Sequence, residues 1–217
     1  MGRPACALSL LGVATALVAG LAAPSPSDAH DELAIQLRIR VAQCPDQPGG
    51  ARRAVQSNDW IEAHIQAATA LLAPHAIRIT AVTEPLTPSL CQLLTRADRD
   101  AFAEEVKMDG AITVLVVPRV RDLDLPSYDL KGVHWRARGR RWIFLTAGAR
   151  PPVLAHELAH YFGLPHDPAG GNLMTPGPSS PAWRSLRPPA PFAPVLTPVQ
   201  VASLRRGIAR HLRQRRR

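Results

Sequence analysis

The chain has 217 residues, a formal net charge of +9, 46% hydrophobic residues and only 5% aromatic residues. This length suits one domain with a substantial core, and the few aromatic side chains are not interleaved with the basic ones, so a specific nucleic-acid surface is not expected. Most of the excess charge comes from seven arginines between Arg205 and Arg217.

The first 29 residues have the pattern of a secretory signal peptide. Arg3 gives a positive start, residues 8–21 are apolar and rich in small side chains, and residues 27–29 offer a small-x-small cleavage site. Cleavage a few residues earlier is also compatible with the pattern. An uncleaved anchor is the alternative, although a membrane span needs about 20 apolar residues. We therefore predict a secreted or periplasmic protein with a single mature domain, residues 30–217.

Three cysteines are present, and removal of the signal peptide would take away Cys6 and leave Cys44 and Cys91. An even pair in an oxidising compartment predicts one disulfide between them. Two separate buried thiols are the alternative, which the spacing alone does not exclude.

The first half of the mature chain alternates strand and helix patterns. Residues 33–41 and 77–82 alternate apolar with polar side chains, which predicts two half-buried strands. Between them, Asp59 and Glu62 form a capping-box pattern, and apolar residues recur at helical spacing up to Pro74, which predicts a long helix.

The next segments predict a shorter helix over residues 96–106 and a strand over residues 111–117. The latter is almost wholly apolar and β-branched, so we expect it to be buried on both faces. Residues 133–137 and 141–147 follow as a hairpin that leads into the next helix, for which Pro151 and Pro152 suit the first turn.

Residues 156–167 contain the pattern HExxHxxGxxH. His156 and His160 are four residues apart, so on a helix both point from one face and can bind one metal ion. Gly163 stands where a residue with positive φ can end the helix and turn the chain, which returns His166 as a third ligand. Three nitrogen ligands leave a fourth position open, as in catalytic zinc sites.

Glu157 lies beside the first of these histidines, where its carboxylate can act as general base for water. The five fixed positions coincide in roughly 2 in 100,000 random chains of this composition, so chance is a poor explanation. One alternative is that the histidines are ordinary polar groups of a helix and loop. Another is an intact metal site without turnover, against which the presence of Glu157 argues. His64, His75 and His134 stand apart and are interpreted as structural or exposed.

The longer motif resembles the zinc signature of the metzincin clan of zinc endopeptidases, most closely bacterial matrixin-like or reprolysin-like members. The resemblance implies a methionine turn, and Met174 follows His166 by eight residues. Asp167 is acidic, as in reprolysin-type and some bacterial members, and is expected to support the site without binding the metal. No cysteine-switch prosegment is visible, and Pro176 stands where some members have a tyrosine ligand, so latency by those routes is not expected.

For the fold, the resemblance implies an α+β domain: a twisted mixed five-stranded sheet, two long helices, an edge strand along the cleft, and a C-terminal helix after the methionine turn. It covers most of the mature chain by element order, but only residues 156–176 by motif.

The last expected element is a basic helix over residues 198–213, which follows a proline-rich loop, residues 176–198. Thr197 and Gln200 form a capping box with proline at the first helical position. Its apolar stripe is expected to pack on the core. Its arginines suggest an anionic surface as a partner, with a solvated helix end as the simpler alternative.

These features predict an exported, monomeric, Zn²⁺-dependent endopeptidase acting on protein or peptide substrates. Peptide hydrolysis follows from the resemblance, since the metal and carboxylate would also suit an amidase acting on cell-wall peptides. The alternative is a catalytically silent, secreted, zinc-containing protein that binds an anionic surface through its C-terminal helix.

Overall fold

The computed structural model describes residues 31–47, 49–167, 171–176 and 194–215, and the chain from Asp31 onward forms one compact unit. The expected signal peptide and most of the proline-rich loop, residues 177–193, lie outside the described residues, so both stay predictions. None of the helices in these described ranges is long and apolar enough to cross a membrane.

The centre of the fold is a mixed sheet whose main strands are parallel. β1 (Leu33–Pro45) lies between β3 (Ile77–Leu86) and β5 (Ile112–Val117), and β5 continues in parallel to β8 (Arg140–Thr146). All six residues of β5 are buried, as its apolar, β-branched sequence predicts for a strand covered on both faces.

Antiparallel strands complete the sheet. β7 (Gly132–Ala137) pairs with β8, and β2 (Arg52–Ala54) pairs with the end of β1. The sheet therefore has six strands, and the prediction of five was wrong because the three exposed residues of β2 carry no apolar alternation. Separately, β4 (Gln92–Leu93) and β6 (Arg119–Val120) form a two-stranded sheet.

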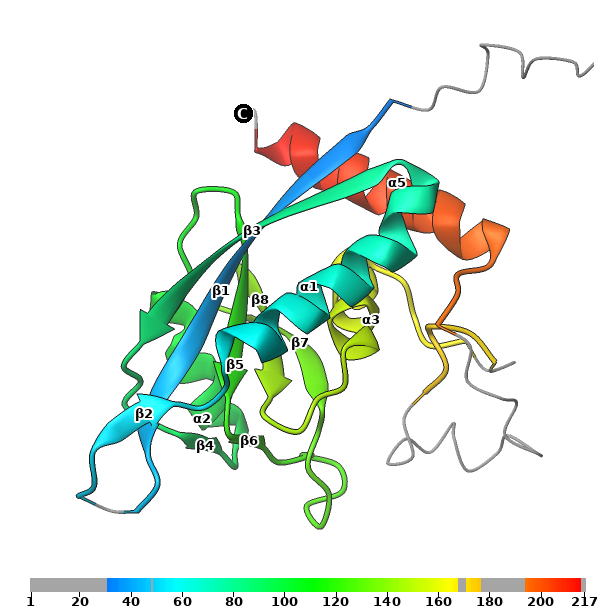
Figure 1. Cartoon of the computed structure of the whole chain (residues 1–217). Coiled ribbons are helices and arrows are strands. Elements are labelled where there is room, and N and C mark those ends of the chain that lie inside the picture. Colours follow the sequence, from blue (N-terminus) through cyan, green and yellow to red (C-terminus); the bar gives the residue numbers. More distant parts are fainter. Residues whose placement is uncertain (1–30, 48, 168–170, 177–193, 216–217) are drawn as a thin grey trace, which may run out of the picture. The chain divides into compact units, whose positions relative to one another are not determined.

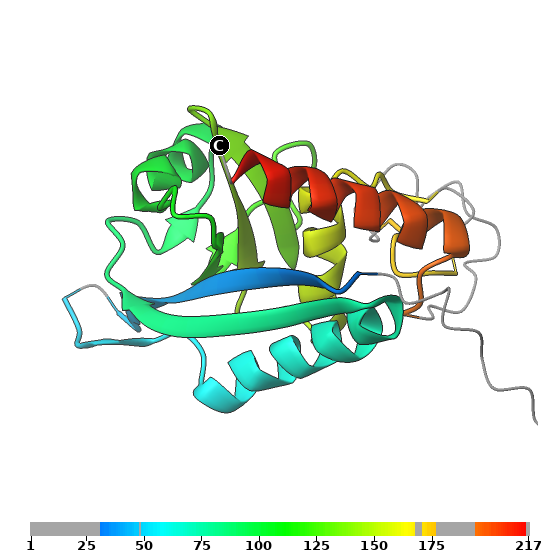
Figure 2. The same ribbon diagram turned by 90° about the horizontal axis from the view of Figure 1, so that it is seen from above.

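Helices cover both faces of the sheet. One apolar cluster joins the sheet to α1 (Asn58–Leu72), α3 (Pro152–Tyr161) and α5 (Pro198–Gln214), and Figure 1 shows α1 lying along β1 and β3 with α3 beside it. A second cluster lies under α2 (Arg96–Asp100) and the 3₁₀ turn η3 (Ala101–Glu105), which Figure 2 shows across the β1–β3 pair from α1. The predicted α+β class is confirmed.

Two helix boundaries differ from the predictions. The N-cap of α1 is Ser57, whose hydroxyl accepts from the Trp60 N–H at 3.2 Å, so Asp59 belongs to the first turn. The helix expected over residues 96–106 is α-helical only to Asp100, after which η3 continues with buried Phe102. A short 3₁₀ turn (η2, Ala73–His75) follows α1.

The β7–β8 hairpin has a two-residue turn, one residue shorter than the predicted connection. Arg138 has φ of 49° and Gly139 has φ of 73°. Positive φ at both central residues is typical of the type I′ turn, whose twist matches that of the paired strands. The turn therefore carries an arginine in a left-handed conformation next to further arginines at the start of β8.

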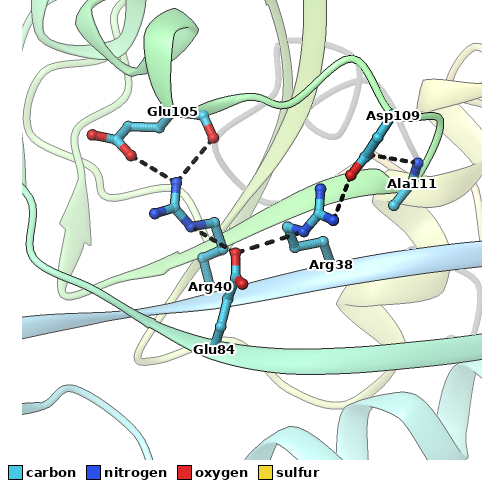
Figure 3. A network of polar contacts seen from close by, with 6 residues as sticks. All are labelled: Arg38, Arg40, Glu84, Glu105, Asp109 and Ala111. Carbon is cyan, nitrogen blue, oxygen red and sulfur yellow. Dashed lines mark hydrogen bonds and ion pairs between the residues drawn. The ribbon is translucent and has the colours of Figure 1, made fainter.

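A network of charged side chains joins β1 and β3 to the segment before β5 (Figure 3). Glu84 lies 3.6 Å from Nε of Arg38 and 3.1 Å from Nε of Arg40. Arg38 also binds Asp109 at 2.5 Å, and Arg40 binds Glu105 at 2.7 Å. The hydrogen bond from Arg38 holds the pKa of the Asp109 carboxyl below its usual value. Charged residues on β1 are thus paired where the sheet passes under this segment.

The predicted disulfide is confirmed: Cys44 at the end of β1 is bonded to Cys91 before β4, across 47 residues of sequence. The segment closed by the bond contains β2, α1 and β3. The bond therefore ties the end of β1 to the chain just before β4.

Replacing both Cys44 and Cys91 by serine is expected to lower the free energy of unfolding by about 3–4 kcal/mol, because the unfolded chain regains the freedom of a long loop. Urea denaturation of the variant and the parent measures this difference. Reduction of the parent by dithiothreitol should give a similar loss, and an unchanged denaturation midpoint in both would show that the bond contributes nothing.

Candidate metal centre

Helix α3 carries the first half of the histidine motif. Pro151 and Pro152 lie at its start, as predicted, where a missing N–H costs least. Its apolar side chains enter the first core cluster (Leu154, Ala155, Leu158 and Ala159). This fixes the rotation of the helix, so that His156 and His160 both point away from the core on one face.

The chain reverses at Gly163, which has φ of +100°. The Gly163 N–H donates to the carbonyl of His160 at 3.0 Å, and the Leu164 N–H donates to the carbonyl of Ala159 at 3.0 Å. This pair of bonds is a Schellman motif, which ends a helix and requires a left-handed residue. The predicted role of Gly163 in the turn is therefore present in the structure.

The reversal brings His166 back to the helix face. The ring nitrogens of His156, His160 and His166 that can bind a metal all lie within 4.8 Å of one another. His156 and His160 are half-buried and His166 is exposed, so the cluster is anchored on the helix side and open on the other. The three residues predicted as ligands from their spacing are thus brought together in space.

Hydrogen bonds decide which nitrogen of each helix histidine faces inward. Nδ1 of His160 donates to the carbonyl of Leu164 at 2.7 Å, and Nδ1 of His156 donates to the carbonyl of Leu173 at 2.7 Å. Nε2 of each ring then carries a lone pair, and these two atoms face each other at 3.0 Å. Two facing lone pairs repel unless a cation lies against them, so the arrangement fits a metal ion.

The environment also keeps the rings neutral, as metal ligands must be. Burial, together with the neighbouring His160 and His166, lowers the pKa of His156 to about 4. Burial likewise lowers the pKa of His166 to about 4 and shifts that of His160 downward. At neutral pH all three lone pairs are available.

Asp167 and Met174 lie in the turn that supports the cluster. The Asp167 N–H donates to the carbonyl of Met174 at 2.8 Å, and the side-chain amide of Asn172 donates to the Asp167 carboxylate at 2.7 Å. Gln200 on α5 reaches the same carboxylate at 3.0 Å. Met174 is fully buried in the first core cluster, directly after Leu173, whose carbonyl holds His156.

Glu157 lies on the adjacent side of α3, against the edge strand β7. Its carboxylate accepts a hydrogen bond from the backbone N–H of His134, while burial raises its pKa to about 8. A cation at the histidines would lower that pKa again, since opposite charge favours the carboxylate.

Gly132 explains how β7 comes so close to Glu157. A Cβ atom at this glycine would lie 2.7 Å from Cγ and 2.8 Å from Oε1 of Glu157, and 2.6 Å from Cγ1 of Val153. Only glycine leaves room for the carboxylate here. A glycine within a strand pattern is the one sequence signal that could have pointed to this contact.

The groups that hydrogen-bond to the histidines, to Glu157 and to Asp167 could not be predicted from the sequence. The carbonyls of Leu164 and Leu173 and the N–H of His134 are backbone atoms, which any residue type supplies. Asn172 and Gln200 act through side-chain amides, and their pairing depends on α5 returning to the methionine turn.

Solved structures with a fold similar to this one include two from a bacterium and an archaeon. Metalloproteinase-II from Bacteroides fragilis matches with a TM-score of 0.53 and 16% identity over 82% of this chain. Archaemetzincin from Methanopyrus kandleri matches with a TM-score of 0.51 and 16% identity over 81% of this chain and 96% of its own. The match spans 55% of the Bacteroides protein. No protein-family model matches the chain, and no curated protein matches it by sequence.

Identity this low shows the fold alone: the chain has a metallopeptidase-like fold in common with these two proteins. The fold agrees with the histidine cluster, because His156, His160 and His166 are the residues of the motif that resembles the metzincin zinc signature. The similarity does not extend to the finer prediction of a matrixin or reprolysin subtype.

We expect the purified protein to bind one zinc ion per chain, because three neutral rings converge on one point. His166→Ala should raise the dissociation constant more than about 100-fold, beyond the loss typical of outer supporting groups. Equilibrium dialysis against a competing chelator, with zinc measured by mass spectrometry, tests this. His75→Ala, outside the cluster, is the matched control, and equal zinc retention in both variants would remove His166 from the site.

Proposed function

We propose that the protein is an exported, zinc-dependent endopeptidase. The observation that carries this proposal is that Glu157, the neighbour of His156 in the histidine cluster, accepts a hydrogen bond from the backbone of the edge strand β7. A general base, a metal site and a strand edge able to bind a peptide are then adjacent.

In this proposal His156, His160 and His166 would hold Zn²⁺. Zinc with three histidine ligands acts as a Lewis acid on a carbonyl group and lowers the pKa of water to about 7. Glu157 takes the proton from the attacking water and passes it to the leaving amine. A C–O bond forms while the peptide C–N bond breaks, so no covalent intermediate with the protein is needed.

The edge strand supports a peptide as the substrate. β7 is the terminal strand in the order of the sheet, and its described residues pair with β8 alone. An extended peptide can add to such an edge through main-chain hydrogen bonds, which places the chain across the site with residues on both sides of the cleaved bond. This favours an endopeptidase over an amidase of small substrates.

Export is supported by two independent features. The first 29 residues have the signal-peptide pattern, and the Cys44–Cys91 bond is of the kind that persists in oxidising compartments. We therefore propose a secreted or periplasmic location.

Glu157→Gln is expected to reduce cleavage of casein at least about 100-fold, since it removes the general base, while zinc content stays unchanged. Glu62→Gln, an exposed residue of α1, is the matched control and should retain full activity. A zinc chelator should abolish cleavage in the parent protein, and added zinc should restore it.

Two results would contradict the proposal. Undiminished cleavage by Glu157→Gln would assign the reaction to other groups. Stable zinc binding without cleavage of any unfolded protein would favour the alternative, a zinc-containing binding protein that uses its basic C-terminal helix.

Gly132→Ala tests the positioning of the base separately. The added methyl group would displace Glu157, and a misplacement of about 1 Å can cost on the order of 100-fold in rate. We expect cleavage to fall by about 10–100-fold with zinc content and fold unchanged. In Gly148→Ala the new atom meets only the end of the flexible Lys131 side chain, so this control should stay active. Equal activity of the two variants would show that β7 does not fix the carboxylate.

A further inference from the structure

A second concave site lies between the β7–β8 hairpin and the C-terminal half of α5. It is a cavity of about 950 Å³ with Tyr161 and Phe162, at the end of α3, in its wall. None of the three clustered histidines lines it, so it is distinct from the metal centre.

The cavity is strongly positive. Seven of its lining residues are arginine or lysine, and among the described residues that line it none is acidic. Only Arg138 has a carboxylate partner, Glu104 at 3.1 Å. Six cations in the described structure are therefore left without an anion: Lys107, Arg136, Arg140, Arg141, Arg210 and Arg215.

Three of these six are held in place by uncharged groups. Arg140 donates to the carbonyls of Ala103 and Val106 at 2.8 and 2.9 Å. Arg141 donates to the carbonyl of Tyr161 at 3.1 Å, and its guanidinium lies 4.5 Å from the centre of the Tyr161 ring. These contacts fix the guanidinium groups but leave their charge unneutralised.

Arg215 is the third. Its guanidinium lies directly against Gly110, which has φ of +90° and where a Cβ atom would collide with it. The backbone of the loop before β5 is thus shaped to admit this side chain. Arg215 also donates to the carbonyl of Asp109 at 3.4 Å.

The other three side chains are exposed and free to reach a ligand. Within the described ranges, Lys107, Arg136 and Arg210 have neither a hydrogen bond nor an ion pair, and they come from three different elements around the opening. Guanidinium groups that are held in place, next to exposed cations that make no other bond in the described structure, are a favourable arrangement for anion capture.

The positive charge of the cavity also affects His211, which lies in its lining. Burial, followed by the positive charges of Arg215 and Arg141, lowers the pKa of His211 to about 4. Like charges collected in one cavity repel one another, which destabilises the fold unless an anion compensates them.

We propose that this cavity binds a ligand that carries several phosphate groups. A phosphate group bears about −1.5 to −2 charge in a small volume and matches the donor fork of a guanidinium, so about three of them neutralise the six cations. A peptide would have to bring six carboxylates into the same 950 Å³. The site lies outside the proposed catalytic centre, and its occupancy does not depend on peptide hydrolysis.

Calorimetric titration of the purified protein with tripolyphosphate tests the proposal. The double variant Arg136→Ala/Arg210→Ala should bind at least about 100-fold more weakly, because each lost charge-assisted contact costs about tenfold in affinity. Arg206→Ala on the same helix does not line the cavity and should bind like the parent. The variant Arg136→Lys/Arg210→Lys should keep most of the affinity of the parent, which separates loss of charge from loss of fold.

Vesicles of phosphatidylcholine with and without phosphatidylinositol bisphosphate, whose headgroup carries several phosphates, distinguish a lipid headgroup from a free oligophosphate. Either result supports the site if it depends on Arg136 and Arg210. Equal tripolyphosphate affinity in the double variant and the Arg206→Ala control would overturn the proposal. Tighter, Arg136- and Arg210-dependent binding of a polyglutamate peptide would overturn the assignment to phosphate. Binding should be the same in Glu157→Gln, so failure of the proposed peptidase activity would leave this test intact.

Discussion

The left-handed turn at Gly163 is the constraint on which the candidate metal centre depends. It ends α3 immediately after the second histidine, and it places the Leu164 carbonyl against Nδ1 of His160. One backbone conformation therefore reverses the chain toward His166 and also selects the ring nitrogen that faces the cluster. A residue with a Cβ atom would be strained at this φ. Replacing Gly163 would therefore disturb both the return of the chain to His166 and the orientation of the His160 ring.

Two packed parts of the fold lie on either side of this turn: the face of α3 that enters the core, and the turn that contains Met174. On one side, the apolar face of α3 packs in the same cluster as α1 and the sheet, which sets the direction of His156 and His160. On the other, the methionine turn presents the Leu173 carbonyl to His156 and is tied through Asp167 to Gln200. The edge strand β7 completes the site because Gly132 lets it approach Glu157.

The sequence predicted what depends on spacing and on local hydrogen bonds. The interval between His156 and His160, the capping box of Thr197 and Gln200, and the buried run of β5 are all local, and each is present. Predictions from sequence were wrong where tertiary packing determines the local structure. β2 pairs with β1 although it has no apolar pattern, and η3 is a 3₁₀ turn that buries Phe102. The basic cavity was also missed, because its arginines come from a hairpin and a helix more than sixty residues apart and only the fold brings them together.

The contacts of α5 bear on the order in which the parts of the site come together as the chain folds. All three histidines precede Gln200, so a growing chain has every metal ligand before it has the amide that braces Asp167. Arg205 of the same helix donates to the carbonyls of Ala76 and Asp31, joining it to the start of the sheet. A chain in which α5 has not yet docked would therefore hold its three histidines without the bond from Gln200 to Asp167, the residue next to His166.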